Sequence, residues 1–231
     1  MLVQFSGVGV TDARGKLGSD VFTRSRYGAM VRKYVYPTNT ITPARTAIRD
    51  AYADIYALWN SLTDFERDLW SMAANNAKRK SKLGHVYAST GKDLFVGCNM
   101  SLVTASQFPV LLPNVLVNTQ PPRQVSLQLL VPSGFRIRVR NYLGSQTVPA
   151  GVVYVVSASP GVSASALYPR NNWRIIDVLA SGSSTSNVDL SSAYSAVFPP
   201  LVSGLRYFVK VHSVVVNSGR KSSFVLTSEV A

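Results

Sequence analysis

Residues 199–224 of this chain read PPLVSGLRYFVKVHSVVVNSGRKSSF. Valines and aromatic residues fill the run Tyr207–Val216, and an Asn-Ser-Gly cluster separates that run from a second one, Ser223–Ser228. β-Branched and aromatic residues favour the half-buried surface of a sheet, whereas Asn, Ser and Gly favour turns. The stretch therefore predicts two successive β-strands at the end of the chain.

Four further strand-like runs lie upstream, separated by clusters of Gly, Pro, Ser and Asn: Ser126–Val131, Phe135–Arg140, Gly151–Ser157 and Trp173–Val178. Many short strands divided by turn residues are typical of an all-β sandwich of about 100 residues. We place this domain at residues 125–231. The preceding residues, 108–124, are rich in proline and predict an extended connector or edge strand.

The first half of the chain follows a different pattern. Two β-rich runs, Val21–Arg26 and Ala29–Tyr36, flank Tyr27-Gly28 and predict a β-hairpin that ends at Pro37. Alternation along each strand would give the hairpin two distinct faces.

Three helices are expected after the hairpin. Thr42-Pro43 is a typical helix start, and Thr63 with Glu66 forms a capping box that opens a second helix after a short link. The short link predicts an antiparallel helical hairpin, and a third helix begins near Ser89 or Thr90. The apolar stripes expected to face the core are Ile48, Tyr52, Ile55, Tyr56 and Trp59, then Phe65, Leu69, Met72 and Ala73, then Leu94, Cys98 and Leu102. The fold class is thus α+β, with a β-hairpin and helical module at residues 1–107 and the β-sandwich after the connector.

Composition points to a globular, strongly basic protein with a net charge of +13. Such a charge favours polyanionic partners, whether nucleic acid, an acidic protein face or anionic lipid. The second half is basic mainly because it lacks acids: from Val96 onward there are ten basic residues and only three acidic ones. A single cysteine, Cys98, excludes an internal disulfide. The first residues do not resemble a signal peptide and no apolar run is long enough to span a bilayer, so we expect neither secretion nor a membrane partner.

Motifs for catalysis or cofactor binding are absent from the sequence pattern. Gly91-Lys92 is not followed by Ser or Thr, as a phosphate-binding loop requires. Two distant histidines and one cysteine cannot supply a structural zinc site. The acidic group Asp64, Glu66 and Asp68 suits the first turn of a helix, where the dipole favours acids. We therefore expect a protein that is not an enzyme, with no catalytic, cofactor-binding or metal-binding residues.

Two basic clusters are the candidate contact sites for a partner or nucleic acid. One lies on the expected hairpin, and the other follows the second helix, whose C-terminal end favours cations. The candidate residues are Arg14, Lys16, Arg24, Arg26, Tyr27, Arg32, Lys33 and Tyr34, then Lys78, Arg79, Lys80 and Lys82.

Three interpretations of the basic hairpin stay open. Its cations could keep an exposed face soluble while Val21, Val31 and Val35 pack inward. Its arginines could follow the phosphates of nucleic acid, with tyrosines stacking on unpaired bases. Its edge could instead dock on a neighbouring subunit, since Arg and Tyr are common in interfaces.

The C-terminal half resembles a fibronectin type III domain, on the residues Leu201, Ser203-Gly204, Tyr207, Val209 and Val211. The resemblance implies that Tyr207 opens the penultimate strand and forms a corner hydrogen bond, and that Asn217-Ser218-Gly219 is the last hairpin turn. Trp173 departs from the pattern, because the tryptophan of that family lies on an earlier strand. Domains of this family are usually spacers or contact modules.

The N-terminal half resembles a group of small, mostly uncharacterised proteins encoded by bacteriophages, prophages and bacteria. The residues that carry the resemblance are ARGKLGSDVFTRSRYGAMVRKYVYPTN followed by TPARTAIRDAYADIYALWNSLTDFERDLWSMAA. The group has no established catalytic site, so the resemblance implies no functional residue. It implies a protein of a virion or mobile element rather than a metabolic enzyme.

These observations favour a non-enzymatic structural protein of a bacteriophage virion, associated with capsid, portal or tail. It would be made in the host cytoplasm and would contact other virion proteins as a homo-oligomer or multi-copy assembly. Two alternatives remain, a basic accessory protein that binds nucleic acid without sequence specificity, and a bacterial surface or adhesion component.

Overall fold

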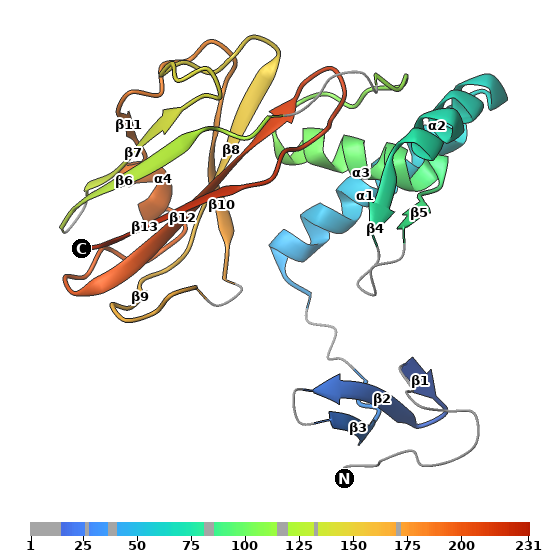
Figure 1. Ribbon diagram of the computed structural model, residues 1–231, viewed down its shortest axis with the longest axis horizontal. Helices are drawn as coiled ribbons and strands as arrows, with labels where there is room; N and C mark the ends of the chain where they lie inside the picture. Colours follow the sequence, from blue (N-terminus) through green and yellow to red (C-terminus); the bar gives the residue numbers. More distant parts are fainter. Residues whose placement is uncertain are drawn as a thin grey trace. The chain divides into compact units, whose positions relative to one another are not determined.

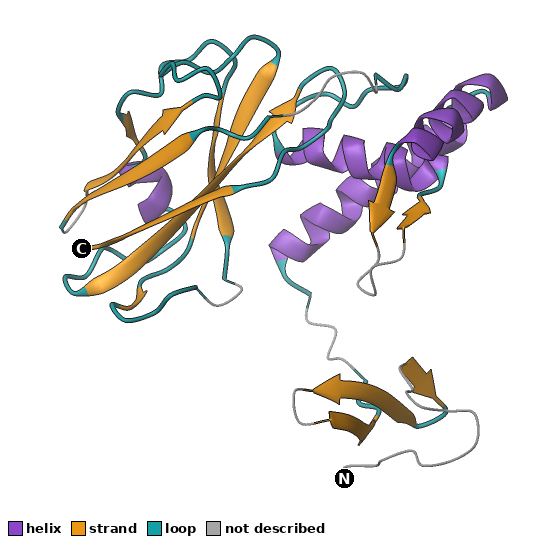
Figure 2. Ribbon diagram, in the orientation of Figure 1, coloured by secondary structure: helices purple, strands orange, loops and turns teal. Residues whose placement is uncertain are grey.

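The computed structural model describes residues 15–25, 28–36, 41–80, 86–114, 120–131, 134–169 and 172–231. Over these residues the fold is α+β, with a small three-stranded sheet, helices α1–α3 and then an antiparallel region of two sheets (Figures 1 and 2). The chain divides into two compact units, Met1–Thr46 and Ala47–Ala231. Among the described helices, none is both long enough and apolar enough to cross a membrane.

The first unit contains an antiparallel sheet with the strand order β1 (Gly15–Leu17), β2 (Asp20–Ser25) and β3 (Gly28–Lys33). The pair β2–β3 confirms the predicted hairpin, and β1 is an additional strand that the sequence pattern did not indicate. Residues 26–27, which join β2 to β3, and Pro37 lie outside the described residues.

The register of this sheet separates the three valines that one interpretation placed together. Val21 lies opposite Arg32, whereas Val31 lies opposite Phe22. Directly paired residues share a face and neighbours along a strand alternate, so Val21 and Val31 lie on opposite faces. Val35 follows β3 and is 77% exposed. The expectation that all three valines pack inward is therefore wrong.

Three helices and a short β-ribbon precede the two-sheet region: α1 (Pro43–Ser61), α2 (Asp64–Asn76), β4 (Lys78–Lys80), β5 (Val86–Ala88) and α3 (Gly91–Thr104). The predicted helix starts are confirmed. The hydroxyl of Thr42 accepts a hydrogen bond from the Arg45 backbone N–H (3.4 Å), and that of Thr90 accepts one from the Asp93 N–H (3.1 Å). The cations 78–80 follow α2, as predicted. They do not lie in its last turn, because the chain has left the helix and entered β4.

The turn between α1 and α2 is fixed by side chains on both sides of it. Thr63 and Glu66 form the predicted capping box, and the Glu66 carboxylate accepts the Thr63 backbone N–H at 2.8 Å. These hydrogen bonds from Thr63 lower the pKa of Glu66. The Arg67 guanidinium donates to the last carbonyls of α1, at Trp59 (3.4 Å) and Asn60 (2.8 Å). Arg67 therefore ties the first turn of α2 to the end of α1.

The helical core is narrower than the predicted stripes. In α1, Ile55 is buried and Trp59 packs on the core, but Ile48, Tyr52 and Tyr56 are exposed. In α2, Phe65 and Met72 are exposed, and the buried positions are Trp70, Ala73 and Ala74. Helical spacing identifies residues that share a face, but it does not identify which face meets a neighbour. The predictions for Ile48, Tyr52, Tyr56, Phe65 and Met72 were therefore wrong.

The second half forms two antiparallel sheets, as the six predicted strands indicated. One sheet has the strand order β11-β7-β6, and the other has the order β10-β8-β12-β13, with β9 also paired to β12. The strands are β6 (Gln124–Leu130), β7 (Gly134–Arg140), β8 (Val152–Ala158), β9 (Val162–Ser163), β10 (Arg174–Leu179), β11 (Val188–Asp189), β12 (Leu205–Val215) and β13 (Val225–Val230). The short elements β9, β11 and helix α4 (Ser191–Ser195) were not predicted.

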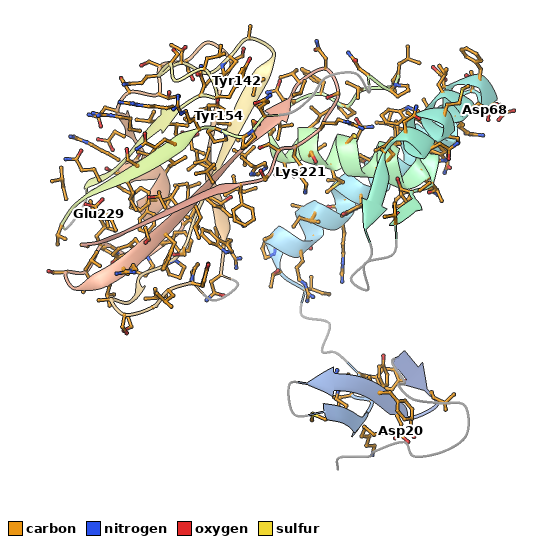
Figure 3. All side chains as sticks on the ribbon, in the orientation of Figure 1. Asp20, Asp68, Tyr142, Tyr154, Lys221 and Glu229 are labelled. Atoms are coloured by element: carbon orange, nitrogen blue, oxygen red, sulfur yellow. The ribbon has the colours of Figure 1, made fainter. Side chains whose placement is uncertain are left out.

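The facing sides of the two sheets share one hydrophobic core, which includes Tyr154 (labelled in Figure 3). Tyr207 of β12 lies in this core, and its hydroxyl accepts the backbone N–H of Val202 at 2.7 Å, so the expected corner hydrogen bond is present. The Tyr194 ring of α4 stacks on Phe135, with ring centroids 4.4 Å apart. A cluster of three aromatic rings, Phe135 of β7, Tyr194 of α4 and Tyr207 of β12, therefore lies in the core of the two-sheet region.

The connector is held by its backbone. The fully buried side chain of Asn99 in α3 accepts the N–H of Val110 (2.8 Å) and donates to its carbonyl (3.1 Å). The Trp70 indole N–H donates to the carbonyl of Leu111 at 2.8 Å. Residues 107–114 therefore run without regular structure but with fixed partners, while 115–119 lie outside the described residues.

Helix α3 belongs to two cores at once. Leu94, Phe95 and Cys98 pack with α1 and α2, whereas Leu102 packs on Val153, Val155 and Val214 of the five-stranded sheet. The turn between β12 and β13 rests on the same helix. Gly219 in this turn has φ +65°, and a Cβ there would come within 2.3 Å of the Cys98 carbonyl oxygen.

Replacing Arg67 by Ala should lower the free energy of unfolding by about 1–2 kcal/mol, because two terminal carbonyls of α1 lose a charged donor. Urea unfolding would measure the change. Asp64→Asn is the matched control, since it removes only the ion pair to Arg67 and the Asp64 side chain is 96% exposed. The control should cost less than about 0.5 kcal/mol. Equal losses in both variants would contradict the capping role of Arg67.

Gly219→Ala should destabilise the second unit by roughly 3 kcal/mol, because it combines a left-handed backbone with a clash against the α3 backbone. Gly182→Ala is the matched control. Gly182 has φ +78° and open space around the position of a Cβ, so this variant carries the backbone strain alone. Thermal or urea unfolding of the two variants separates the cost of the backbone strain from the cost of the clash with α3. If both lose the same stability, the close contact between the turn and α3 is not present in solution.

Candidate functional site

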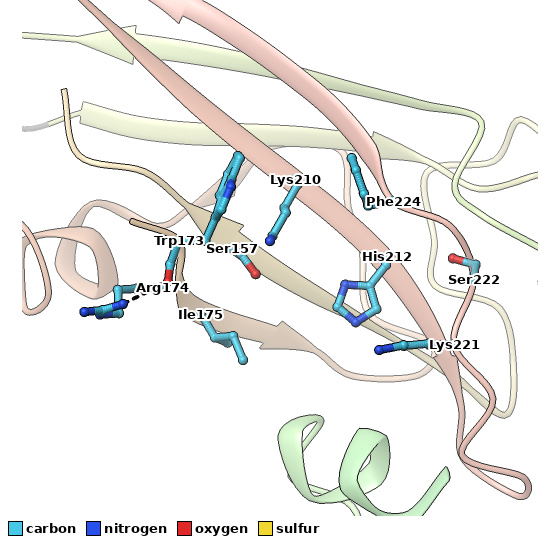
Figure 4. A pocket seen from close by; sticks show the side chains of 9 residues that line it. All are labelled: Ser157, Trp173, Arg174, Ile175, Lys210, His212, Lys221, Ser222 and Phe224. Atoms are coloured by element: carbon cyan, nitrogen blue, oxygen red, sulfur yellow. Dashed lines mark hydrogen bonds between the residues drawn. The ribbon is translucent and has the colours of Figure 1, made fainter. Parts of the chain in front are cut away.

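A groove lies on the outer face of the five-stranded sheet, beside the part that α3 covers. On β12, Tyr207, Val209 and Val211 point into the core, so Lys210 and His212 point outward. The groove has a volume of about 310 Å³ and is drawn in Figure 4. Its lining residues are Ser157, Trp173, Arg174, Ile175, Lys210, His212, Lys221, Ser222 and Phe224.

Four segments of the chain build this groove, and one of them is β8 with Ser157. Trp173 and Ile175 come from the start of β10, and Lys210 and His212 come from the middle of β12 (Figure 4). Lys221 lies beyond the turn that rests on α3, where it pairs with Val214, and Figure 3 labels it at the helical end of the two-sheet region. The pairing of β10, β8 and β12 is what brings these segments together.

The groove is positively charged. Arg174, Lys210 and Lys221 contribute cations, and the lining includes no carboxylate. Burial and the neighbouring Lys221 lower the pKa of Lys210. Burial, together with Lys221 and Lys210, lowers the pKa of His212 to about 4, so the imidazole is neutral at pH 7. An anion in the groove would relieve the repulsion among these groups.

Apolar surface borders the cations. The Lys210 Nζ lies 4.4 Å from the centroid of the Trp173 ring, a cation–π contact that holds the two side chains together. Phe224 is 61% exposed and Ile175 is 45% exposed. A ligand that fits here has an acidic group for the cations and an apolar part for the rings.

Of the two serines that line the groove, one already has hydrogen-bond partners and the other is buried. The Ser222 hydroxyl already accepts the Ser213 N–H (3.0 Å) and donates to the Ser223 carbonyl, and Ser157 is buried. His212 has no acidic partner in the lining. Across the described part of the chain, no group of three or more His, Cys, Asp or Glu side chains is placed to hold a metal ion.

The described residues of the predicted basic hairpin are divided between two faces of the first sheet. Lys16 and Arg32 both lie opposite Val21 and therefore share a face, whereas Lys33 lies opposite Asp20, on the other face. The Lys16 Nζ lies 3.8 Å from the centroid of the Tyr34 ring. The structure therefore brings Lys16, Arg32 and Tyr34 together and separates Lys33 from them.

The other candidates are less fully placed. The backbone register pairs Arg24 with Ala29, and Lys78, Arg79 and Lys80 with Ala88, Tyr87 and Val86. The side chains of these four cations lie outside what the structure describes, as do all atoms of Arg14, Arg26, Tyr27 and Lys82.

The groove residues were not among the candidates from the sequence. The available signal was the run Val209–His212, in which a lysine and a histidine alternate with valines. Polar residues at every second position mark the outward face of a strand, but they do not show that Trp173 and Lys221 lie beside it.

A search with models of known protein families finds no match to this chain, and none of the curated proteins matches it.

The lowered pKa of His212 predicts that stability falls as the pH drops from about 6.5 to about 4. Over that window the unfolded chain takes up a proton on His212 that the folded chain does not, and this costs at most about 1.4 kcal/mol per pH unit. His212→Gln should therefore show a shallower loss of stability in urea unfolding at pH 7, 5.5 and 4.5. Lys221→Gln should give an intermediate slope, because it keeps His212 but removes one repulsive neighbour. Parallel slopes for wild type and His212→Gln would contradict a neutral, half-buried imidazole.

Proposed function

We propose that this chain is a non-enzymatic structural protein of a bacteriophage particle, and that it binds an acidic segment of another virion protein. The observation that carries the proposal is the groove, where Arg174, Lys210 and Lys221 lie among apolar rims without a carboxylate. The resemblance of the N-terminal half to phage-encoded proteins supports the setting, with capsid, portal and tail as the sites of assembly.

The groove suits a protein partner better than a bare polyanion. Protein interfaces combine a central aromatic or arginine contact with apolar surface that excludes water. Here Trp173, Phe224 and Ile175 supply that apolar surface next to the cations. A peptide carrying Asp or Glu beside an apolar residue would satisfy both parts of the site.

The two-sheet region supports a contact role of its own. Its strand orders, β11-β7-β6 and β10-β8-β12-β13, support the proposal of a fibronectin type III-like sandwich. The Tyr207 hydrogen bond and the turn at Gly219 fit the same assignment. Trp173 does not fill the tryptophan position of that family. It lies outside the core, in the groove, where it is available to a partner.

Exposed apolar side chains on the helices are consistent with a multi-copy assembly. Ile48, Tyr52 and Tyr56 follow one another at four-residue intervals along α1, and each is at least 40% exposed. In the first unit, the exposed cations Lys16 and Arg32 share a face of the sheet that we assign to docking on a neighbouring subunit.

Particle incorporation tests the proposal. Wild-type protein should be present in purified particles at a fixed copy number by quantitative mass spectrometry. The double variant Arg174→Ser, Lys221→Ser should be incorporated at least about tenfold less, which corresponds to about 1.4 kcal/mol of lost binding. Arg220→Ser removes a nearby cation that does not line the groove, and it should be incorporated normally.

Two outcomes would overturn the proposal: absence of the wild-type protein from particles, or normal incorporation of the groove variant. The same incorporation assay tests the docking role of the basic hairpin separately. Replacing Lys16 and Arg32 by Ser should abolish incorporation, and normal incorporation of that variant would exclude the hairpin as a docking site while leaving the groove proposal intact.

A further inference from the structure

A row of arginines lies on the outer face of the other sheet. Along β7, Phe135, Ile137 and Val139 are buried in the core, so Arg136, Arg138 and Arg140 occupy the outward positions. We call these three residues the arginine row. Alternate residues of a strand are separated by about 6.6 Å, so the row presents three cations in a straight line at regular intervals.

The neighbours of the row on β6 are polar and uncharged. Gln124, Ser126 and Gln128 of β6 lie directly opposite Arg140, Arg138 and Arg136. Two shallow depressions of about 70 and 160 Å³ follow the row, lined by these side chains with Ile137 and Asn187. Amide and hydroxyl groups beside guanidinium groups provide many hydrogen-bond donors along one line.

The internal partners of the row leave most of its charge unbalanced. Arg136 Nε lies 3.3 Å from the Asp189 carboxylate, whose pKa is lowered mainly by hydrogen bonds from Ser191. Arg138 Nε donates to the Ser186 carbonyl at 2.7 Å, which fixes the guanidinium without neutralising it. Within the described part of the chain, Arg140 has no ion pair, and its side chain is exposed.

We propose that the arginine row binds the phosphate backbone of single-stranded nucleic acid without sequence preference. Guanidinium groups bind phosphate through two parallel hydrogen bonds, and Arg138 is already held in place for this. The regular interval between the cations is close to that between successive phosphates of an extended strand. The site lies on the opposite sheet from the groove and goes beyond the proposed contact with a virion protein.

A single strand fits this geometry better than a duplex or an acidic protein. Three cations in a line about 13 Å long contact the phosphates of one strand only, so the second strand of a duplex would add no contact. A protein interface needs an apolar centre, but the six facing positions of β6 and β7 carry only Gln, Ser and Arg. The structure therefore favours a flexible, linear polyanion.

Fluorescence anisotropy with the full chain and a labelled 20-nucleotide oligo(dT) tests the proposal. Each phosphate contact contributes about −0.7 to the slope of log K against log salt, so three contacts alone weaken binding about 20-fold between 50 and 200 mM salt. The double variant Arg138→Gln, Arg140→Gln should flatten the slope by about 1.4 and weaken binding at least about tenfold at 50 mM salt. Arg140→Gln alone should flatten it by about 0.7 and leaves the Arg138 bond to Ser186 intact.

Matched controls distinguish the row from the general positive charge of the chain. Arg174→Gln, Lys221→Gln removes the same charge from the groove, and Arg32→Gln, Lys33→Gln removes it from the first sheet. Both should bind oligo(dT) within about twofold of wild type. Equal losses in the controls and the row variants would overturn the site, as would unchanged binding by Arg140→Gln. Tighter binding of a duplex, or equal competition by poly-glutamate, would overturn the single-strand assignment.

Discussion

The contact between α3 and the outer face of the five-stranded sheet is the constraint on which the second unit depends. Because α3 packs on α1 and α2 through Phe95 and on β8 and β12 through Leu102, it carries apolar residues on more than one side. The turn at Gly219 closes against the helix backbone, so the helices and the two-sheet region form one compact unit. The same contact covers only one end of the outer sheet face. The remainder of that face, with Lys210 and His212, is left open as the groove.

Because the second half has few acidic residues, most cations on its two sheets lack a carboxylate partner. A carboxylate on a neighbouring strand stabilises a cation on a sheet, but among the described strands of the second half only Arg136 has an ion pair of this kind. Lys210 contacts the Trp173 ring, and Arg138 bonds to a backbone carbonyl, and neither contact removes charge. The positive charge is therefore distributed over the outer faces of both sheets, where it is available to external anions.

Local signals accounted for most of the secondary structure that the sequence could predict. The caps at Thr63 and Thr90 and the six longer strands were identified because hydroxyl caps and β-branched runs act within a few residues. Strands of two or three residues, such as β1 and β9, carry no periodicity and exist only through their pairing. The exposed Phe65 shows that an apolar stripe predicts burial only where another element covers it. The groove was beyond reach for the same reason, since Trp173 meets Lys210 only after β10, β8 and β12 have paired.

The two proposed sites lie on the outer faces of two sheets that pack against each other, so the sites point in opposite directions. This arrangement limits how they could act. Facing sheets pack about 10 Å apart, so a strand bound along Arg138 and a peptide bound beside His212 would lie on opposite sides of one thin layer. Val139 and Ile137 on one sheet and Tyr207 and Val209 on the other belong to a single buried core. A ligand on either face therefore meets a surface whose shape is already fixed by that core. We infer that the two sites act as independent contacts on a rigid spacer, which would join partners by position rather than by a change of conformation.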